Sequence, residues 1–203
     1  MHKEVLNTQQ VELLPLLKEF KREFYLVGGT AIALQIGHRR SIDFDLFKLA
    51  PLKHKAIISK ISNYKFQTNI TRRVTEQLNV TINHVKFTFY QYPYNIPATI
   101  VFDDLIKMPD LKHLAAMKAY ALGRRSKWKD YVDLFFLIRY HFSISEISAK
   151  ANELFKDMFS EKLFRAQLSY FEDIDFNEQI EYIIPPIQED EIKAFLIEAA
   201  TNI

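Results

Sequence analysis

Apolar and polar residues along this chain follow a strand-like period in some stretches and a helix-like period in others. The first apolar run, Phe24 to Val27, has the length and β-favouring composition of a buried strand, and it ends at Gly28 and Gly29. The apolar run from Ala31 to Ile36 that follows predicts a packed helix. We therefore expect a strand, a glycine corner and a helix N-terminus, with Thr30 as the helix cap. Such a corner suits phosphate, because helix N-termini present unpaired amides and partial positive charge.

The next stretch alternates strictly and predicts a strand with one acidic face. Ile42, Phe44 and Leu46 fall on one face, whereas Asp43 and Asp45 fall on the other with Cα atoms roughly 7 Å apart. Like charges this close repel unless they are solvated or share a cation. A solvated strand face is one interpretation. The other is a divalent ion, Mg²⁺ or Mn²⁺, which two carboxylates would hold together with substrate phosphate oxygens. Next to a phosphate-binding corner, this pair predicts a site for a nucleoside triphosphate and its metal.

The rest of the pattern predicts strands first and helices later. An N-terminal helix capped by Thr8 is expected to be interrupted at Pro15. Alternating β-branched and aromatic residues from Phe66 to Tyr94 predict two or three antiparallel strands. Helices are expected over residues 52–63, from Leu111, from Trp128, from a Ser143/Glu146 capping box, over Leu163–Ile174 and over Asp190–Ala200. The pattern thus predicts an α/β core followed by a helical half.

Composition narrows the class of protein only modestly. The chain has 203 residues, of which 48% are hydrophobic and 26% charged, as expected for one compact body with a helical subdomain. It shows no apolar run near the length of a membrane span and no signal-peptide pattern, so we expect a cytoplasmic protein without membrane association. Cysteine is absent, which excludes disulfides and thiolate metal sites. A net charge of +2 is too mild to indicate nucleic-acid binding by itself.

Several charged residues outside the acidic strand have two interpretations each. Arg39 and Arg40 could clamp a triphosphate or form a solvated pair at a helix end, and we expect His38 at the surface. Lys118 lies between Leu114 and Ala121 on an apolar helix stripe, so it must either extend to solvent or meet an anion.

A basic cluster precedes a helix that carries two acids. Asp130 and Asp133 share a helix face, and Lys129 is expected to pair with Asp133 at i, i+4. A surface helix with internal ion pairs, capped by Ser126, is one interpretation. The other is contact with an RNA backbone through the cluster, which consists of Arg124, Arg125, Lys127 and Lys129.

Two segments carry a family resemblance. Gly28-Gly29-Thr30, followed by Arg40-Ser41-Ile42-Asp43-Phe44-Asp45-Leu46, resembles the first motif of DNA polymerase β-like nucleotidyltransferases. The chain is more similar to their AbiEii/AbiGii toxin branch. The last motif of that branch is similar to the segment Lys127-Trp128-Lys129-Asp130-Tyr131-Val132-Asp133-Leu134. The resemblance implies an α/β (α+β) fold with a mixed sheet flanked by helices. It places a nucleotidyltransferase core at residues 1–107 and a helical region that completes the active-site cleft at residues 108–203.

The resemblance also implies an activity and a set of roles. The reaction is transfer of a nucleoside monophosphate from an NTP to an acceptor hydroxyl. Some relatives are toxins that act on the tRNA 3′ end, which implies tRNA or another RNA as acceptor and a cognate antitoxin as partner. Lys118 would pair with triphosphate charge, and Asp133 would orient that lysine or deprotonate the acceptor, with Asp130 the weaker candidate. The nucleotide-binding residues would be Gly28, Gly29, Thr30 and Arg40, and the ligands of Mg²⁺ or Mn²⁺ would be Asp43 and Asp45.

One departure from the superfamily keeps other functions open. Polymerase β-like enzymes usually carry a third carboxylate on a later strand, and the expected counterpart here offers Thr88. Asp103 and Asp104 follow and could substitute. A non-catalytic nucleotide-binding or interaction module, and a nucleotidyltransferase that acts on a small molecule such as an aminoglycoside, are the alternatives.

Overall fold

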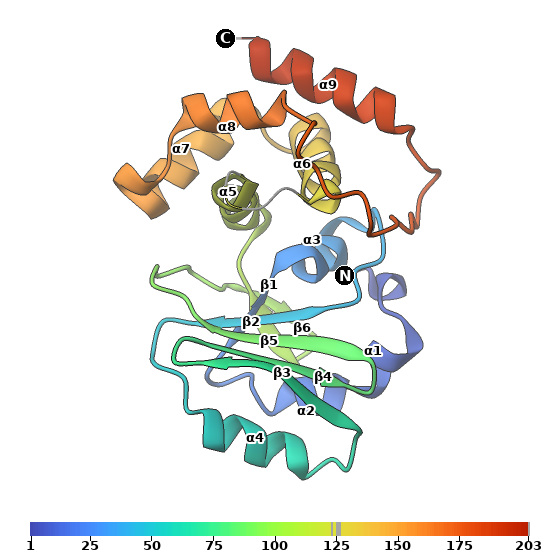
Figure 1. The fold of residues 1–203 in the computed structure, drawn as a ribbon, viewed down its shortest axis with the longest axis vertical. Helices are drawn as coiled ribbons and strands as arrows, with labels where there is room; N and C mark the ends of the chain where they lie inside the picture. Colours follow the sequence, from blue (N-terminus) through green and yellow to red (C-terminus); the bar gives the residue numbers. More distant parts are fainter. Residues whose placement is uncertain (123, 125–126, 203) are drawn as a thin grey trace. The chain divides into compact units, whose positions relative to one another are not determined.

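A computed structural model describes residues 1–122, 124 and 127–202. The chain divides into two compact units, which we call unit 1 (Met1–Asp110) and unit 2 (Leu111–Ile203). Unit 1 contains the sheet and unit 2 is helical (Figure 1). The chain therefore has the α+β composition that the hydrophobic pattern predicts.

Unit 1 is built on a seven-stranded mixed sheet, counted over the described residues, with the order β3-β4-β5-β2-β1-β7-β6. Its central strands β1 and β2 are antiparallel, and each has a parallel neighbour on its outer side, β7 and β5 respectively. The pairs β3–β4 and β4–β5 are antiparallel, which confirms the strands predicted between residues 66 and 94. The strands are β1 (Tyr25–Val27), β2 (Phe44–Lys48), β3 (Thr68–Val74), β4 (Gln77–Ile82), β5 (Val85–Gln91), β6 (Ile100–Phe102) and β7 (Ile106–Met108).

The helices of unit 1 follow the predicted breaks with one corrected cap. The predicted interruption is present at Leu13, and Pro15 lies in the first turn of the second helix, where the N–H that proline lacks would have no partner within the helix. The cap of the first is Asn7 rather than Thr8: its side chain accepts a hydrogen bond from the Gln10 N–H, and Gln10 bonds back to it. The elements are η1 (Lys3–Val5), α1 (Thr8–Glu12), α2 (Leu14–Lys18), α3 (Gly28–Ile36) and α4 (His54–Ser62).

Unit 1 has buried apolar residues on both faces of the sheet, and the face that carries Phe44 and Leu46 is the more aromatic one. Phe44 and Leu46 of β2 are fully buried there, and Phe20 packs its ring 4.8 Å from that of Phe89 on β5. The helices α2 and α4 are drawn on this side of the sheet and α3 on the other (Figure 1). Ile42 does not join the core and is 57% exposed, because β2 begins only at Phe44.

Unit 2 consists of helices and their connections. The capping box of Ser143 and Glu146 is present, as predicted. The helix expected over Leu163–Ile174 instead begins at Glu161 after a Ser160 cap and ends at Leu168. Among the described residues, no helix is long and apolar enough to cross a membrane. The elements are α5 (Leu111–Leu122), α6 (Trp128–Tyr140), α7 (Ile144–Phe155), η2 (Lys156–Met158), α8 (Glu161–Leu168) and α9 (Glu189–Thr201).

Candidate active site

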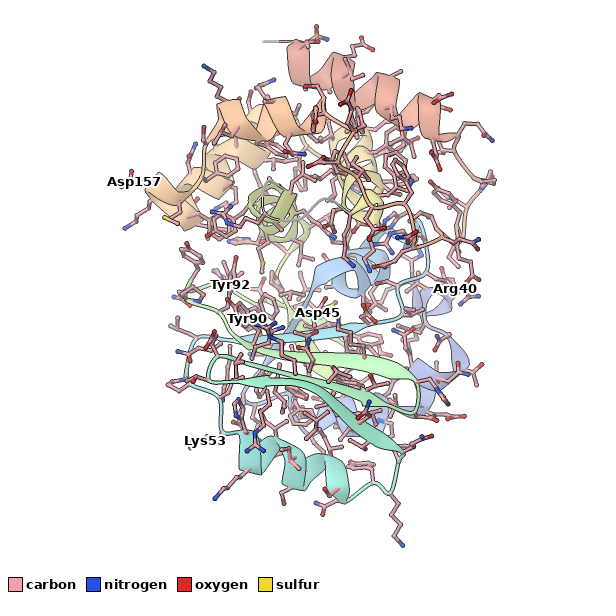
Figure 2. All side chains as sticks on the ribbon, viewed as in Figure 1. Arg40, Asp45, Lys53, Tyr90, Tyr92 and Asp157 are labelled. Carbon is pink, nitrogen blue, oxygen red and sulfur yellow. The ribbon has the colours of Figure 1, made fainter. Side chains whose placement is uncertain are left out.

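The glycine corner and the acidic strand meet in unit 1. Strand β1 ends at Val27, helix α3 begins at Gly28, and Val27 pairs with Asp45 across the β1–β2 ladder. Gly28 has φ +74°, and a Cβ on it would overlap the Asp45 carboxylate oxygen Oδ2. Gly28 is therefore required for two reasons: its φ is positive, and the Asp45 carboxylate approaches its backbone closely. Figure 2 labels Asp45 at this position on the sheet. The structure thus brings the predicted phosphate corner and one predicted metal ligand into contact.

Thr30 joins the same two segments but does not cap the helix. The N-cap residue is Val27, whose side chain makes no capping bond, so the predicted cap is wrong. Thr30 lies in the first turn of α3 and is buried. Its hydroxyl donates to the carbonyl oxygen of Asp43 and lies 3.0 Å from Ser41 Oγ. We conclude that this side chain fixes the backbone of the first predicted metal ligand against α3.

Of the two arginines, Arg39 rather than Arg40 lies at the corner. A Cβ on Gly29 would lie 2.7 Å from Arg39 Nη2, and the Arg39 side chain is only 3% exposed. Arg40 instead donates through Nη1 to the carbonyl oxygens of Glu4 and Leu6, at 2.9 and 3.2 Å. The sequence presents two adjacent arginines and does not reveal which one turns inward. His38 is buried as well, contrary to the expected surface position.

Thr88 occupies the expected place of the third carboxylate. Strand β5 runs parallel to β2, and Thr88 lies directly opposite Asp45. The two acids proposed as substitutes lie elsewhere, in the turn before β7. Asp103 pairs with Lys3, and Asp104 lies 2.9 Å from Lys21 and 3.2 Å from Lys18. Because β1 and β7 separate β6 from β2, this turn does not supply the missing acid beside Asp45.

The donor set in unit 1 fits a metal that is shared with a substrate. The described residues contain no cluster of three or more His, Asp or Glu side chains that would hold a metal by themselves. Asp43 and Asp45 are half-buried and adjacent to helix amides at the start of α3. Mg²⁺ is usually held by one or two carboxylates and completes its octahedral shell with water and phosphate oxygens. Two carboxylates beside a phosphate-binding corner match this requirement.

In unit 2, one lysine lies between two acids. Lys118 of α5 is buried, and its Nζ contacts Asp130 Oδ1 and lies 2.8 Å from Asp133 Oδ2. Both aspartates are completely buried on one face of α6. The lysine therefore meets anions and does not extend to solvent. Asp130, the weaker candidate from sequence, contacts it as directly as Asp133 does.

The basic cluster is largely engaged within unit 2. Lys127 and Lys129 both bind Glu178, so the predicted i, i+4 pair of Lys129 with Asp133 is wrong. Arg124 donates to the carbonyl oxygens of Tyr120 and Met158 and stacks 3.6 Å over the Tyr120 ring. Arg125 and the predicted cap Ser126 lie outside the described residues. Two of the four predicted RNA contacts thus share one acid from the segment before α9, which offsets one of their two positive charges.

Glu178 provides a pH-dependent attachment of that segment. Burial alone would raise the pKa of Glu178, but hydrogen bonds from Lys127 and Lys129 outweigh it and lower the pKa from 4.5 to about 2. Because the folded-state pKa lies below the ordinary value, the contact stabilises the fold above about pH 4.5, and this stabilisation is lost as the pH falls toward 2. We expect Glu178→Gln to flatten the pH dependence of the unfolding free energy in this window, measured by urea titration. Glu172→Gln, on the same segment, serves as control; an equal flattening there would contradict the assignment.

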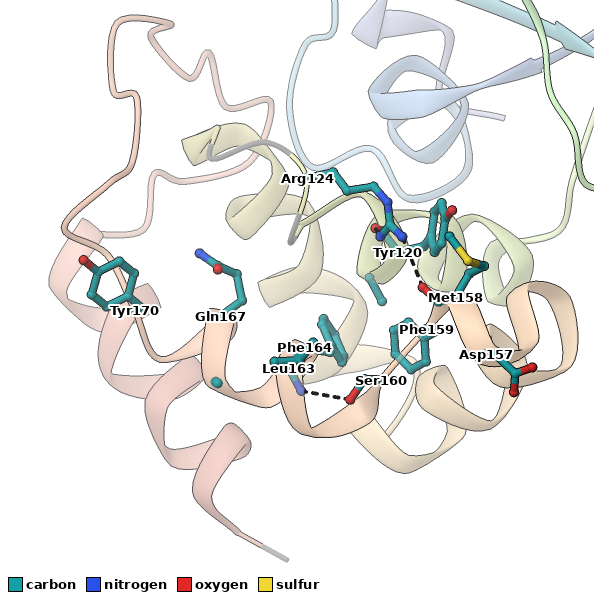
Figure 3. A pocket seen from close by; sticks show the side chains of 12 residues that line it. Tyr120, Arg124, Asp157, Met158, Phe159, Ser160, Leu163, Phe164, Gln167 and Tyr170 are labelled. Atoms are coloured by element: carbon teal, nitrogen blue, oxygen red, sulfur yellow. Dashed lines mark hydrogen bonds between the residues drawn. The ribbon is translucent and has the colours of Figure 1, made fainter.

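A pocket of about 670 Å³ lies on a different side of α5. It is lined by α5 residues Ala119 and Tyr120 and by residues of η2, α8 and their connections, including Phe159, Gln167 and Tyr170 (Figure 3). None of the predicted catalytic or nucleotide-binding residues lines it. Lys118 lies two residues from Tyr120, so the two side chains leave the helix on nearly opposite faces.

Comparison with known proteins assigns the family. The model of the nucleotidyl transferase AbiEii toxin family, described as a type IV toxin–antitoxin system, matches residues 16–103 and 95–201. The chain belongs to the AbiEii family. Among curated proteins, the AbiEii-family chain is 30% identical over 164 residues to the uncharacterized protein aq_aa25 of Aquifex aeolicus, covering 74% of this chain and 75% of the relative.

Solved structures confirm the fold of this AbiEii-family member. MenT4, a nucleotidyltransferase toxin from Mycobacterium tuberculosis, aligns with 95% of this chain and 82% of its own, with a TM-score of 0.64 and 14% identity. JHP933 from Helicobacter pylori aligns with 96% of this chain and 91% of its own, with a TM-score of 0.58 and 15% identity. At this level of identity the likeness establishes the nucleotidyltransferase fold, which the first motif implied from sequence.

Proposed function

We propose that this AbiEii-family protein transfers a nucleoside monophosphate from an NTP to the 3′ end of tRNA, and that it acts as a toxin with a cognate antitoxin. The observation that carries the proposal is the contact of the Asp45 carboxylate with the Gly28 backbone at the N-terminus of α3. It places a predicted metal ligand next to unpaired helix amides, the arrangement that a metal-bound triphosphate needs.

The reaction balances without a covalent enzyme intermediate. The oxygen of the acceptor hydroxyl forms a bond to the α-phosphorus, the bond from that phosphorus to the bridging oxygen breaks, and pyrophosphate leaves. Amides in the first turn of α3, at Gly28, Gly29 and Thr30, bind the terminal phosphates. Asp43 and Asp45 would hold Mg²⁺ or Mn²⁺, which neutralises phosphate charge when bound. Thr30 keeps this arrangement rigid through its bond to the Asp43 carbonyl.

Three residues of unit 2 have roles in the proposed reaction. Lys118 supplies a cation for triphosphate charge, and Asp133, 2.8 Å from its Nζ, orients that cation or takes the proton of the acceptor hydroxyl. Asp130 shares the orienting role because it contacts the same ammonium group. These roles call for little chemistry from the protein itself, since phosphoryl transfer depends mostly on positioning and charge stabilisation.

The experiment is a label-transfer assay. Each α-labelled NTP is incubated with the protein, Mg²⁺ and either total RNA, protein extract or an aminoglycoside. We expect label in the tRNA fraction, abolished by EDTA, with an apparent affinity for RNA that falls steeply as salt rises. Label in protein or in the aminoglycoside would replace tRNA as acceptor. Tight NTP binding without pyrophosphate release would establish the non-catalytic alternative.

A further inference from the structure

A polar row crosses the sheet of unit 1 and ends at Asp45. The ladders place Asp45 of β2 opposite Thr88 of β5, Thr88 opposite Asn79 of β4, and Asn79 opposite Arg72 of β3. Directly paired residues project from the same face of a sheet, so these four side chains form one continuous line. With neighbouring strands about 4.8 Å apart, Arg72 lies roughly 14 Å from Asp45.

The row lies on the face of the sheet opposite to Phe44 and Leu46 of β2. Leu78 and Val80, which flank Asn79 on β4, are completely buried. Because successive strand residues point to opposite faces, Asn79 points to the face opposite to theirs, and its partners Thr88 and Arg72 do the same. Figure 2 labels Tyr90, the next residue of β5 on this face, near Asp45. An irregularity between Ile70 and Arg72 sets the register that brings Arg72 into line.

Beyond Asp45, every member of the row offers a hydrogen-bond donor. Gln77 Nε2 donates to Asn79 Oδ1 at 2.9 Å, which leaves the amino group of Asn79 directed away from that bond. Thr88 contributes a hydroxyl and Arg72 a guanidinium. Within the described part of the chain, Arg72 forms no ion pair, in contrast to Lys127 and Lys129. A line of donors that ends in a free guanidinium matches an anionic polymer rich in oxygen acceptors.

We propose that this row, Thr88, Asn79 and Arg72, binds the sugar–phosphate backbone of the RNA acceptor as its 3′ end reaches Asp45. The inference rests on the proposed function and adds the surface that recognises the acceptor. Arg72 binds a backbone phosphate, whereas Asn79 and Thr88 bind phosphate or 2′-hydroxyl oxygens closer to the reacting end. The Thr88 hydroxyl can donate a hydrogen bond to such an oxygen, which an ionised carboxylate at this position could not do.

One neighbouring cation on the same face supports this assignment. Lys86 lies two residues before Thr88 on β5 and therefore projects from the same face. It is exposed and pairs in the ladder with Thr81, another polar residue. This face thus combines the exposed cation of Lys86 with neutral polar side chains along a second line beside the first.

Adjacent arginines on β3 provide a matched test. Arg72 pairs with Asn79 on the face of the row, whereas Arg73 pairs with the buried Leu78 and projects from the opposite face. Arg72→Glu and Arg73→Glu change the net charge equally. Both side chains are exposed, so neither substitution should disturb the fold. Binding is measured by fluorescence anisotropy with a labelled single-stranded RNA ending in CCA and with bulk tRNA, at about 50 mM and 200 mM salt.

We expect Arg72→Glu to weaken the binding of both RNAs about tenfold or more and to reduce the salt dependence of binding. The RNA affinity of Arg73→Glu should stay within about twofold of that of the unaltered protein. In the transfer assay, Arg72→Glu should raise the KM for tRNA and leave the KM for NTP unchanged. Asn79→Leu tests the neutral part of the row and should raise the tRNA KM without changing the salt dependence. Circular dichroism confirms that each variant folds.

The outcomes separate this inference from the proposed function. Equal weakening by the two glutamate variants, or no weakening by either, would overturn the assignment of the row while tRNA labelling by the unaltered protein still supported the function. Failure of the unaltered protein to label or bind any RNA would overturn both. Selective loss with Arg72→Glu, in binding and in tRNA KM together, supports the row as the acceptor surface.

Discussion

Replacing Asp45 with asparagine is expected to lower nucleotide transfer by at least about 100-fold while the protein stays folded. The amide keeps the shape of the carboxylate beside Gly28 but carries no charge to bind a metal-bound triphosphate. Removing a half-buried negative charge next to Asp43 also relieves repulsion, so we do not expect a loss of stability. The measurement is the rate of label transfer to RNA under single-turnover conditions, with thermal unfolding followed in parallel.

Asp104→Asn is the matched control for this result. Asp104 is also an aspartate of unit 1, but its side chain is exposed and paired with Lys18 and Lys21. Its replacement should change the transfer rate less than about twofold and leave the unfolding transition almost unchanged, because exposed ion pairs contribute little to stability. Full activity in Asp45→Asn would remove the contact between the acid and the glycine corner from the mechanism.

Replacing Lys118 with methionine is expected to destabilise the protein by roughly 3–5 kcal/mol. Two fully buried carboxylates, Asp130 and Asp133, would lose the cation that contacts them both. Breaking a buried ion pair costs more than the pair contributes, because the remaining charge is left without compensation. The single tryptophan of the chain, Trp128, begins the helix that carries both acids, so its fluorescence in a urea titration reports on this region.

The triple variant Lys118→Met/Asp130→Asn/Asp133→Asn distinguishes charge from packing. Removing both acids together with the lysine should recover at least about half of the lost stability. Lys112→Met, a control on the same helix as Lys118, removes an exposed ion pair with Glu146 of α7 and should leave the urea midpoint almost unchanged. Both Lys118 variants should stay inactive in the transfer assay. A single Lys118→Met variant that unfolds at the same urea concentration as the unaltered protein would contradict the buried triad.

The sequence predicted those features that depend on local patterns. The strand that ends at Val27, the helix break before Pro15 and the capping box at Ser143 each follow from a few adjacent residues. The order of the motif places the acids near the glycine corner, and the structure shows that an antiparallel ladder between β1 and β2 produces the contact of Asp45 with Gly28. The placement of Ile42 on the apolar face of the strand is wrong, because the alternation of apolar and polar residues begins two residues before β2 does.

Features that depend on distant partners could not be predicted in this way. Lys129 has a suitable acid at i+4, yet it binds Glu178, which lies on the segment before α9. Either arginine of the Arg39–Arg40 pair could have faced the glycines, and only the tertiary arrangement turns Arg39 inward. The alignment of Arg72 with Asn79 depends on a strand irregularity that has no clear signal in the composition of β3.

The position of each strand within the sheet gives the polar row unequal stiffness. Asp45 belongs to a central strand that is held by neighbours on both sides, whereas Arg72 belongs to the rim strand β3, which has a single neighbour and is exposed along its whole length. Local unfolding of an edge strand breaks hydrogen bonds to one neighbour only, so it costs less free energy than local unfolding of a central strand. If RNA binds along the row, its reacting end would contact the rigid position of Asp45. The more distant part of the RNA would contact Arg72, whose strand can shift to fit different backbone paths.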